Sequence, residues 1–435
     1  MKIAWFKRII SPEKGSLIAG YSYKDVSIMK LDDLYMTGLC CDDGKQKVLI
    51  ISFDLIALDA WVVQKIRSEC ASILHVPESA ILLTCTHNHS GPQTITEAGH
   101  EEQFHKSYVD ALVCAILEET TALEGNFQEA DVYFYSMNVD ENLNRRYVTA
   151  DNHASFLPHR EELRPLADGF ADKELGSLIF VDKATGNPIY TIGNYAAHPL
   201  AGHSPGLGGL RISADFPGAF RDYVTAETGA ECMFISGAAG DMIPKEDELG
   251  SDSARQMGIR LGKAHIRAII DATRNPGRFL MPDAGTGSLL RTFSAQLRAK
   301  YKNNPAMLTK EYRGKKDITM EIQYVSIGDI SFVGLPGEPC AELGQEIKWH
   351  SPFRRTFIAY ASTGYVDYIC PANFLVAGGY EAMSHRFTAR NSIDLVKTVV
   401  DGLFELRDTV FPSAAEEMYP DNLDLPLVCI PPNRN

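Results

Sequence analysis

Short apolar runs alternate with amphipathic patterns along this chain. Residues 47–58 (KVLIISFDLIAL) predict a buried strand, and residues 60–74 predict a helix whose apolar stripe includes Val63 and Ile66. The apolar run of residues 80–87 (AILLTCTH) predicts a second strand. A strand, a helix and a further strand in this order favour an α/β fold.

Two later segments predict β-hairpins. Residues 176–195 hold two apolar runs around the turn KATGN, and residues 320–337 turn at Gly328-Asp329. Helical patterns recur at 103–119, 253–274 and 389–408. The Gly- and Pro-rich stretch 274–287 predicts a long connection, and no linker or repeat divides the chain. We therefore expect one α/β domain over residues 1–435.

The composition restricts the possible partners. The chain has 42 basic and 56 acidic residues, which gives a formal charge of −14. Nucleic acids and anionic membranes are bound by basic surfaces, so this charge disfavours both as partners. No apolar run approaches the roughly 20 residues that span a bilayer, so we expect no transmembrane segment. The oligomeric state stays open.

The amino terminus and the cysteines favour a cytoplasmic location. The opening sequence MKIAWFKRIISPEKGS lacks the apolar region and the cleavage site of a secretory signal. The nine cysteines are scattered and form no CxxC pair. This pattern is typical of reduced thiols and disfavours a disulfide scaffold or a cysteine zinc site.

Polar residues follow four of the predicted apolar runs. His87 and His89 close one run, His198 follows NYAA, Asp241 follows FISGAAG, and Glu338 follows FVGLPG. Side chains that carry chemistry collect at strand ends in α/β proteins, and residues i and i+2 of an extended chain point to the same face. Each feature alone is also typical of a structural or solvated residue. Together, imidazoles and a carboxylate are the ligands of catalytic zinc sites, which keep a position open for water.

Bound zinc would make this a hydrolytic site. The ion lowers the pKa of its water and polarises a carbonyl, which is sufficient to cleave an amide or an ester. The HExxH motif of thermolysin-like proteases is absent, and so are the glycine-rich motifs of dinucleotide and P-loop sites.

The same segments resemble the neutral/alkaline (non-lysosomal) ceramidases, zinc amidases that split N-acyl sphingosine. The segments TCTHNHSGP, ENLNRR, NYAAHP and SADFPG are similar to THTHSGP, INRSP, FAVHP and SSDNxG of that family. The segments GAAGDMIP, LPGEP and YVDYICPANFLVAGGYEA are similar to SNxGDVSP, VPGEF and YxxYVTTxEEYxxQxYEG. They occur in the same order from about residue 80 to 385. The resemblance implies the fold of the ceramidase catalytic domain, with mixed β-sheets flanked by helices.

The resemblance also implies roles for single residues. It implies that zinc is bound by His87, His198, Glu338 and Tyr368. Tyr380 would lie close to the reacting carbonyl, and His89 and Arg145 would donate hydrogen bonds to a developing oxyanion. In a zinc hydrolase of this kind, we expect His89 or Asp241 to transfer the proton.

The chain departs from the family at a serine. In GDVSP the serine is the proposed nucleophile or a substrate contact, but here the residue is Ile243, whose alkyl group cannot attack, donate or accept. We expect Ile243 to contact an apolar part of the substrate or to fill space. The chain also ends soon after its last predicted helix, so we expect no C-terminal immunoglobulin-like domain. These differences disfavour long-chain ceramide as the substrate.

Three functional hypotheses follow. The first is a zinc-dependent hydrolase that cleaves an amide, ester or lactone bond of a small substrate through a metal-bound water. In this hypothesis His203 and Arg211, in the segment AGHSPGLGGLR, contact a polar or anionic substrate, although the segment equally fits a simple surface turn. The second is a ceramidase-type amidase that acts on N-acyl lipids without the serine. The third is a non-catalytic metal- or carbohydrate-binding protein.

Overall fold

The largest element of the fold is an eight-stranded mixed sheet with the strand order β14-β12-β11-β6-β1-β3-β4-β5. Its strands are β1 (Lys2–Ile9), β3 (Tyr35–Asp42), β4 (Lys47–Phe53), β5 (Ile81–Cys85), β6 (Gln128–Asn138), β11 (Glu174–Asp182), β12 (Pro188–Tyr195) and β14 (Glu231–Ser236). The computed structural model describes residues 1–20, 24–148, 154–156, 167–202, 210–245, 250–282 and 284–412.

The two edges of this sheet approach each other. The Oγ of Ser52 in β4 donates a hydrogen bond to the carbonyl of Phe234 in β14 (2.6 Å). The Oγ of Ser236, at the end of β14, donates to the carbonyl of Thr86, which follows β5 (2.8 Å). Since β5 and β14 stand at opposite ends of the strand order, the sheet must curve round on itself. The chain that leaves β5 therefore meets the chain that leaves β14.

A second sheet packs against the first. Its four strands are β16 (Thr286–Gln296), β17 (Asp317–Ile327), β18 (Ile330–Gly334) and β20 (Arg355–Ala359). Alternate residues of β4 point to opposite sides, as in any strand. Ile50 belongs to the core that the two sheets share with Val325 and Phe332, whereas Ile51 and Phe53 belong to the core under the first helices.

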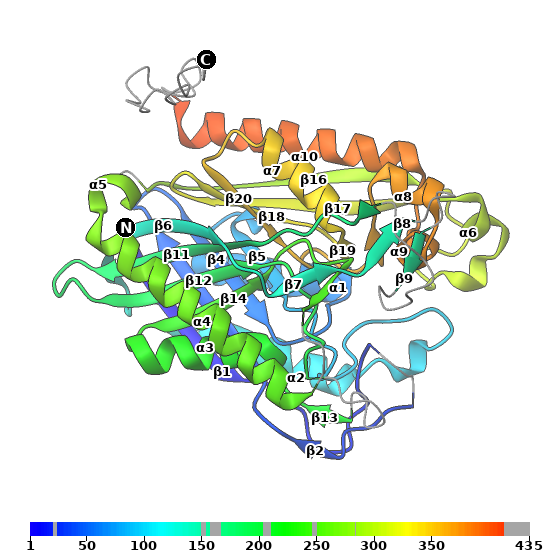
Figure 1. The fold of residues 1–435 in the computed structure, drawn as a ribbon, viewed down its shortest axis with the longest axis horizontal. Helices are drawn as coiled ribbons and strands as arrows, with labels where there is room; N and C mark the ends of the chain where they lie inside the picture. The colour runs from blue at the N-terminus through cyan, green and yellow to red at the C-terminus, as the bar shows by residue number, and fades with distance from the viewer. Residues whose placement is uncertain are drawn as a thin grey trace, which may run out of the picture.

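Helices cover the outer faces of both sheets (Figure 1). They are α1 (Ala60–Leu74), α2 (Lys106–Ala122), α3 (Asp215–Thr228), α4 (Ser251–Arg274), α7 (Ala341–His350) and α10 (Ala389–Val410). Figure 1 shows α10 along the top of the view above the four-stranded sheet, with α3 and α4 on the opposite side. The predicted mixed α/β fold is confirmed. Within the described ranges, no helix has the length and apolar character needed to cross a membrane.

Most local predictions are confirmed. The helix at 60–74 begins and ends where its pattern predicts, and it connects β4 and β5, which pair in parallel. Both hairpins form, as β11–β12 and β17–β18. The predicted strands at 47–58 and 80–87 were too long, because the chain turns after Phe53 and Cys85 and the two turns hydrogen-bond to each other. The stretch 274–287 is a connection that contains the short helix α5 (Pro276–Phe279).

Candidate metal centre and its cavity

Three histidines from distant parts of the chain meet beside the strand ends. His87 and His89 follow β5, and His198 follows β12. Each offers one ligand atom, and these atoms all lie within 4.8 Å of one another. Glu338 joins them from β19 (Glu338–Pro339), which pairs in parallel with β21 (Tyr368–Ile369) so that Glu338 is opposite Tyr368. The curvature of the large sheet is what brings these segments together.

Main-chain carbonyls fix the ring orientation of the histidines. The Nδ1 of His87 is 2.9 Å from the carbonyl oxygen of Ile56, and the Nδ1 of His198 is 2.6 Å from that of Ala239. The Nδ1 of His89 lies 3.2 Å from a third carbonyl. A carbonyl can only accept a hydrogen bond, so each Nδ1 carries the hydrogen. In its neutral form each ring therefore presents a lone pair at Nε2.

The carboxylate of Glu338 lies against two of these lone pairs. Its Oε2 is 3.3 Å from the Nε2 of His87 and 3.1 Å from the Nε2 of His198. Burial disfavours its charged form, but the charge of His87 and the hydrogen bonds from His198 and His87, which the imidazoles supply when they are protonated, outweigh burial and hold the pKa of Glu338 well below its usual range. The hydroxyls of Tyr360 and Tyr365 donate hydrogen bonds to its two oxygens, at 2.9 and 2.5 Å.

This arrangement fits a metal ion. Burial, together with the charges of Arg145 and His87, lowers the pKa of His198, which favours its neutral form. A neutral His198 and an ionised Glu338 then face each other with two acceptor atoms, a contact that a shared cation stabilises. Imidazole nitrogen and carboxylate oxygen are ligands that Zn²⁺ takes in proteins. The donor set alone does not distinguish zinc from other divalent ions.

The backbone is strained around the site. His87 has a φ of 66° and Asp367, which precedes Tyr368, has a φ of 60°. Non-glycine residues rarely adopt this left-handed conformation, and it concentrates at functional sites. The prediction that His87 and His89 address one site is confirmed, since their ring centroids are 4.8 Å apart. The reason given for it was wrong, because the chain is turned at His87 and not extended.

Arg145 connects Tyr368 to the framework. It follows β7 (Asn142–Asn144), and its Nη2 donates to the hydroxyl of Tyr368 (3.1 Å) while its Nε donates to Glu381 (2.8 Å). Burial, followed by the charge of Glu338, raises the pKa of Tyr368 well above its ordinary value. Tyr380 begins α9 (Tyr380–Ser384), and its ring lies 5.5 Å from that of Tyr368. The two phenols and the guanidinium thus form one cluster beside Glu338.

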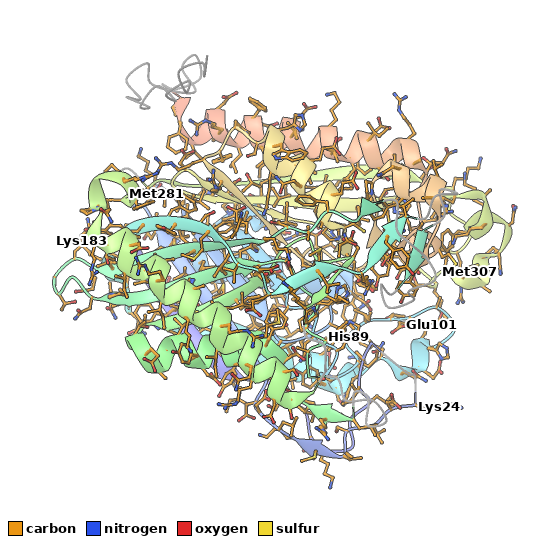
Figure 2. All side chains as sticks on the ribbon, viewed as in Figure 1. Lys24, His89, Glu101, Lys183, Met281 and Met307 are labelled. Carbon is orange, nitrogen blue, oxygen red and sulfur yellow. The ribbon has the colours of Figure 1, made fainter. Side chains whose placement is uncertain are left out.

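A cavity of about 350 Å³ extends from this centre. Its buried part, here called the inner end, is formed by His87, Glu338 and Tyr368. Its partly exposed part, here called the outer end, includes Glu97 and Met307. Most of the lining side chains are polar. Figure 2 shows His89, Glu101 and Met307 in the right-hand half of the view, and of these His89 and Met307 line the cavity.

Several predicted site residues lie elsewhere. Among the residues that the structure describes, the cavity lining does not include Asp241, Arg211 or Ile243. It also lacks the described residues Arg145 and His198, which instead contact the lining residues Tyr368 and Glu338. The two carboxylate oxygens of Asp241 accept from the amide of Ala341 and from the Nδ2 of Asn144, both at 2.7 Å, and burial raises its pKa to about 6. Arg211 is in β13 (Arg211–Ile212) and Ile243 is in β15 (Met242–Pro244). His203 lies outside the described residues. The roles assigned to Asp241, Arg211, Ile243 and His203 stay predictions.

The segment GAAGDMIP supports the site with its main chain, which the sequence analysis missed. Carbonyl oxygens of residues 239–242 accept hydrogen bonds from the Nδ1 of His198 and from the main chain and guanidinium of Arg145. A Cβ at Gly240 would lie 2.7 Å from the carbonyl oxygen of Glu338. The glycine among small residues was the available signal, since it marks a close approach of two backbones.

A buried ion pair behind the histidines was also missed. Both Nη atoms of Arg221 donate to the carboxylate of Asp54, at 2.8 and 2.5 Å, and both residues are fully buried. The carbonyl of Asp54 accepts from the Nδ2 of Asn88, between His87 and His89. A single aspartate inside the apolar run ISFDLIAL was the sequence signal for this pair, since buried charges are normally paired.

The fold is similar to that of solved ceramidases. No protein-family model matches the chain, and no curated protein matches it. A neutral ceramidase from Pseudomonas aeruginosa superposes with a TM-score of 0.76 at 16% sequence identity, over 94% of this chain and 74% of that chain. A ceramidase complexed with C2 superposes with a TM-score of 0.76 at 15% identity, over 94% of this chain and 75% of that one. The predicted ceramidase-like fold is therefore confirmed.

Proposed function

We propose that this chain is a zinc-dependent hydrolase that cleaves an amide, ester or lactone bond of a small substrate. The observation that carries the proposal is the contact of one Glu338 oxygen with the Nε2 atoms of His87 and His198 at the inner end of a cavity. When bound there, zinc would polarise a carbonyl group and lower the pKa of a water molecule toward neutrality, the chemistry that hydrolysis requires.

We propose as metal ligands the residues whose donor atoms lie close to one another at the inner end of the cavity. His87, His198 and Glu338 hold the ion, and the resemblance to ceramidases supports Tyr368 as the fourth ligand. His89 is the alternative, since its ligand atom belongs to the same close group. With Tyr368 or His89 as a fourth protein ligand, a water molecule would make the ion five-coordinate, a coordination number that catalytic zinc can adopt.

The surrounding residues would orient the substrate and move protons. Tyr380 lines the cavity, and burial raises the pKa of its phenol, so the hydroxyl stays protonated and can donate to a carbonyl oxygen of the substrate. Arg145 would hold the hydroxyl of Tyr368 in place. If Tyr368 is the fourth ligand, the imidazole of His89 is placed to accept a proton during attack and return it to the leaving group.

Two alternatives are supported by other observations. The fold match to ceramidases favours an amidase that acts on N-acyl lipids. The isoleucine at position 243, where ceramidases carry a serine, favours a non-catalytic protein that binds a metal or a carbohydrate. In each case a cytoplasmic location and a small-molecule ligand are part of the proposal.

Metal analysis and a substrate panel test the proposal. Elemental analysis of the purified full-length chain is expected to give about one zinc per chain, as a single-ion site requires. N-acetyl amino acids, N-acetyl sugars, lactones and a short-chain ceramide are then assayed with and without a chelator. Turnover that the chelator abolishes and added zinc restores supports the hydrolase. A folded protein that takes up no metal contradicts it, and zinc without turnover of any substrate supports the non-catalytic alternative.

A further inference from the structure

We propose that the outer end of the cavity selects a small N-acyl compound whose amine portion carries hydroxyl or ammonium groups, and that the carboxylate of Glu97 is the group that selects it. This inference rests on the proposed hydrolase function and names the substrate class of the same site. The amine portion of an N-acyl sphingosine also carries hydroxyl groups, so the proposed class differs from the lipids that the resemblance to ceramidases suggests in having a short polar amine portion without a long alkyl chain.

Glu97 stands on a loop whose shape is fixed by side-chain hydrogen bonds. The Nε2 of Gln93 donates to the Oε1 of Glu97 and to the carbonyl of Ile95, both at 3.0 Å. The amide and the hydroxyl of Thr96 both donate to the carboxylate of Asp59, at 3.0 and 2.6 Å. The Glu97 carboxylate is therefore held at the cavity wall before a substrate arrives, which reduces the entropy that binding must oppose.

The charge of Glu97 is not balanced by the protein. Within the described ranges no basic side chain forms an ion pair with Glu97, whereas Asp367, another carboxylate of the lining, is paired with Arg386 at 2.8 Å. An ionised carboxylate accepts strong hydrogen bonds from hydroxyl and ammonium groups, repels other carboxylates and gains nothing from an alkyl chain. This wall therefore favours substrates rich in hydrogen-bond donors.

One nitrogen of Arg386, in the same wall, has no hydrogen-bond partner among the described residues. Arg386 lines the cavity and is buried, and the nitrogen is its Nη1. Buried donors of this kind cost free energy unless a ligand or water satisfies them. Because this nitrogen is itself buried, an oxygen of a polyhydroxylated or carbonyl-bearing substrate would accept from it once the Arg386 side chain turned toward the cavity.

The size and the apolar part of the cavity fit a short acyl group. A volume of about 350 Å³ is near the lower limit of ligand pockets, which run from about 300 to 1,000 Å³. The buried apolar lining consists of Ile18, Ile56 and Ile95, which can cover a short acyl chain. A long alkyl chain gains binding free energy only where it contacts apolar walls, and the remaining lining of this cavity is mainly polar.

Substrate competition tests this inference on the zinc-loaded full-length protein. We compare kcat/KM for N-acetylglucosamine, N-acetylputrescine, N-hexanoylsphingosine and 4-nitroacetanilide. At least one of the first two is expected to exceed the ceramide, and which one does so distinguishes hydroxyl from ammonium recognition. Glu97→Gln is expected to raise KM for that substrate about 10- to 100-fold, as the loss of a charge-assisted hydrogen bond predicts, with kcat within about threefold.

Matched controls distinguish a loss of substrate selectivity from a general folding defect. In the Glu97→Gln variant, turnover of 4-nitroacetanilide should be unchanged, because that substrate offers no hydroxyl or ammonium group. Glu102→Gln replaces an exposed glutamate of the adjacent turn η2 (Glu101–Gln103) and should leave every substrate unchanged. A preference for the ceramide, or an equal effect of Glu97→Gln on all substrates, overturns this inference while leaving the hydrolase intact. Absence of chelator-sensitive turnover of all four overturns this inference, and the hydrolase is overturned as well if the lactones of the wider panel are also not cleaved.

Discussion

The two ends of the cavity are held in place by different parts of the protein. At the inner end, His87 and Glu338, together with His198 that contacts Glu338, are at most 2% exposed, and carbonyl oxygens of the main chain fix the two imidazole rings. At the outer end, Glu97 is partly exposed and Met307 is 44% exposed. The loop that carries Glu97 is shaped by hydrogen bonds between side chains.

This difference indicates which end can change without loss of the fold. Main-chain carbonyls at strand ends are positioned by the two sheets, so the inner end follows from the fold itself. Side-chain hydrogen bonds in a loop depend on single residues, and loops tolerate substitution better than the elements they connect. We therefore expect proteins of this fold to share the inner end and to differ in substrate through the outer end.

Removal of an inner ligand should have the largest effect. His198→Ala deletes one of the two imidazoles that contact Glu338 and leaves that carboxylate buried beside fewer partners. We expect loss of bound zinc and at least a 100-fold loss of chelator-sensitive turnover, since even residues outside the ligand set change metal affinity about 10- to 100-fold. Elemental analysis and steady-state kinetics measure both quantities.

The control for this variant is His350→Ala, at the exposed end of α7. It should bind zinc and turn over substrate like the unmodified chain. If His198→Ala retains both zinc and turnover, the metal site is not at the inner end, and the division of the cavity drawn above is wrong.

A substitution of Glu381, which contacts the inner end through Arg145, should have an intermediate effect on activity. Glu381 is buried and binds the Nε of Arg145, which in turn donates to Tyr368. We expect Glu381→Gln to lower kcat about tenfold through displacement of the two tyrosines, while zinc remains bound. Unfolding free energy should fall by about 3 kcal/mol, as is typical when one partner of a buried ion pair is removed.

Glu381→Asp should recover part of the lost kcat, because it restores the charge, whereas a general packing defect would not respond to charge. Glu346→Gln, on the exposed side of α7, serves as the surface control. Loss of zinc together with activity would instead show that Glu381 supports the whole ligand set and not only the positions of Tyr368 and Tyr380.

Local features of this molecule could be predicted from the sequence. The helix at 60–74 and both hairpins depend on periodicity and on turn residues, which are signals within a short window. His87, His198 and Glu338 could be nominated because each polar residue interrupts or follows an apolar run. Their position beside one another could be expected only from the resemblance, since nothing local relates residues so far apart.

The remaining features depend on long-range or main-chain structure. The approach of β5 to β14 results from curvature of the whole sheet, which no segment encodes by itself. Carbonyl oxygens that orient His198 and Arg145 belong to the main chain, and main-chain atoms are the same in every residue. The left-handed turn at His87 is unfavourable for a histidine in isolation, so local preference predicts the opposite.

The smallest effect on activity is expected at Ile243, the position where the ceramidase family carries a serine. Ile243 pairs with Leu143 between β15 and β7, is partly exposed, and is absent from the cavity lining among the described residues. We expect Ile243→Ser to change kcat/KM less than about twofold for all substrates, including the short-chain ceramide. Unfolding free energy should fall by about 1 kcal/mol, because a half-buried alkyl group is lost.

The same substrate panel and a thermal melt test this expectation, with Ile243→Val as the control that keeps the alkyl group. A gain of ceramide cleavage in Ile243→Ser would mean that residue 243 faces the bound substrate. Specificity would then be shared between the outer loop and the segment that supports His198, and the two ends of the cavity could not vary independently. If Ile243→Ser changes no activity, the two ends of the cavity can vary independently. The segment then supports the site through its carbonyl oxygens, and these stay in place whatever side chain occupies position 243.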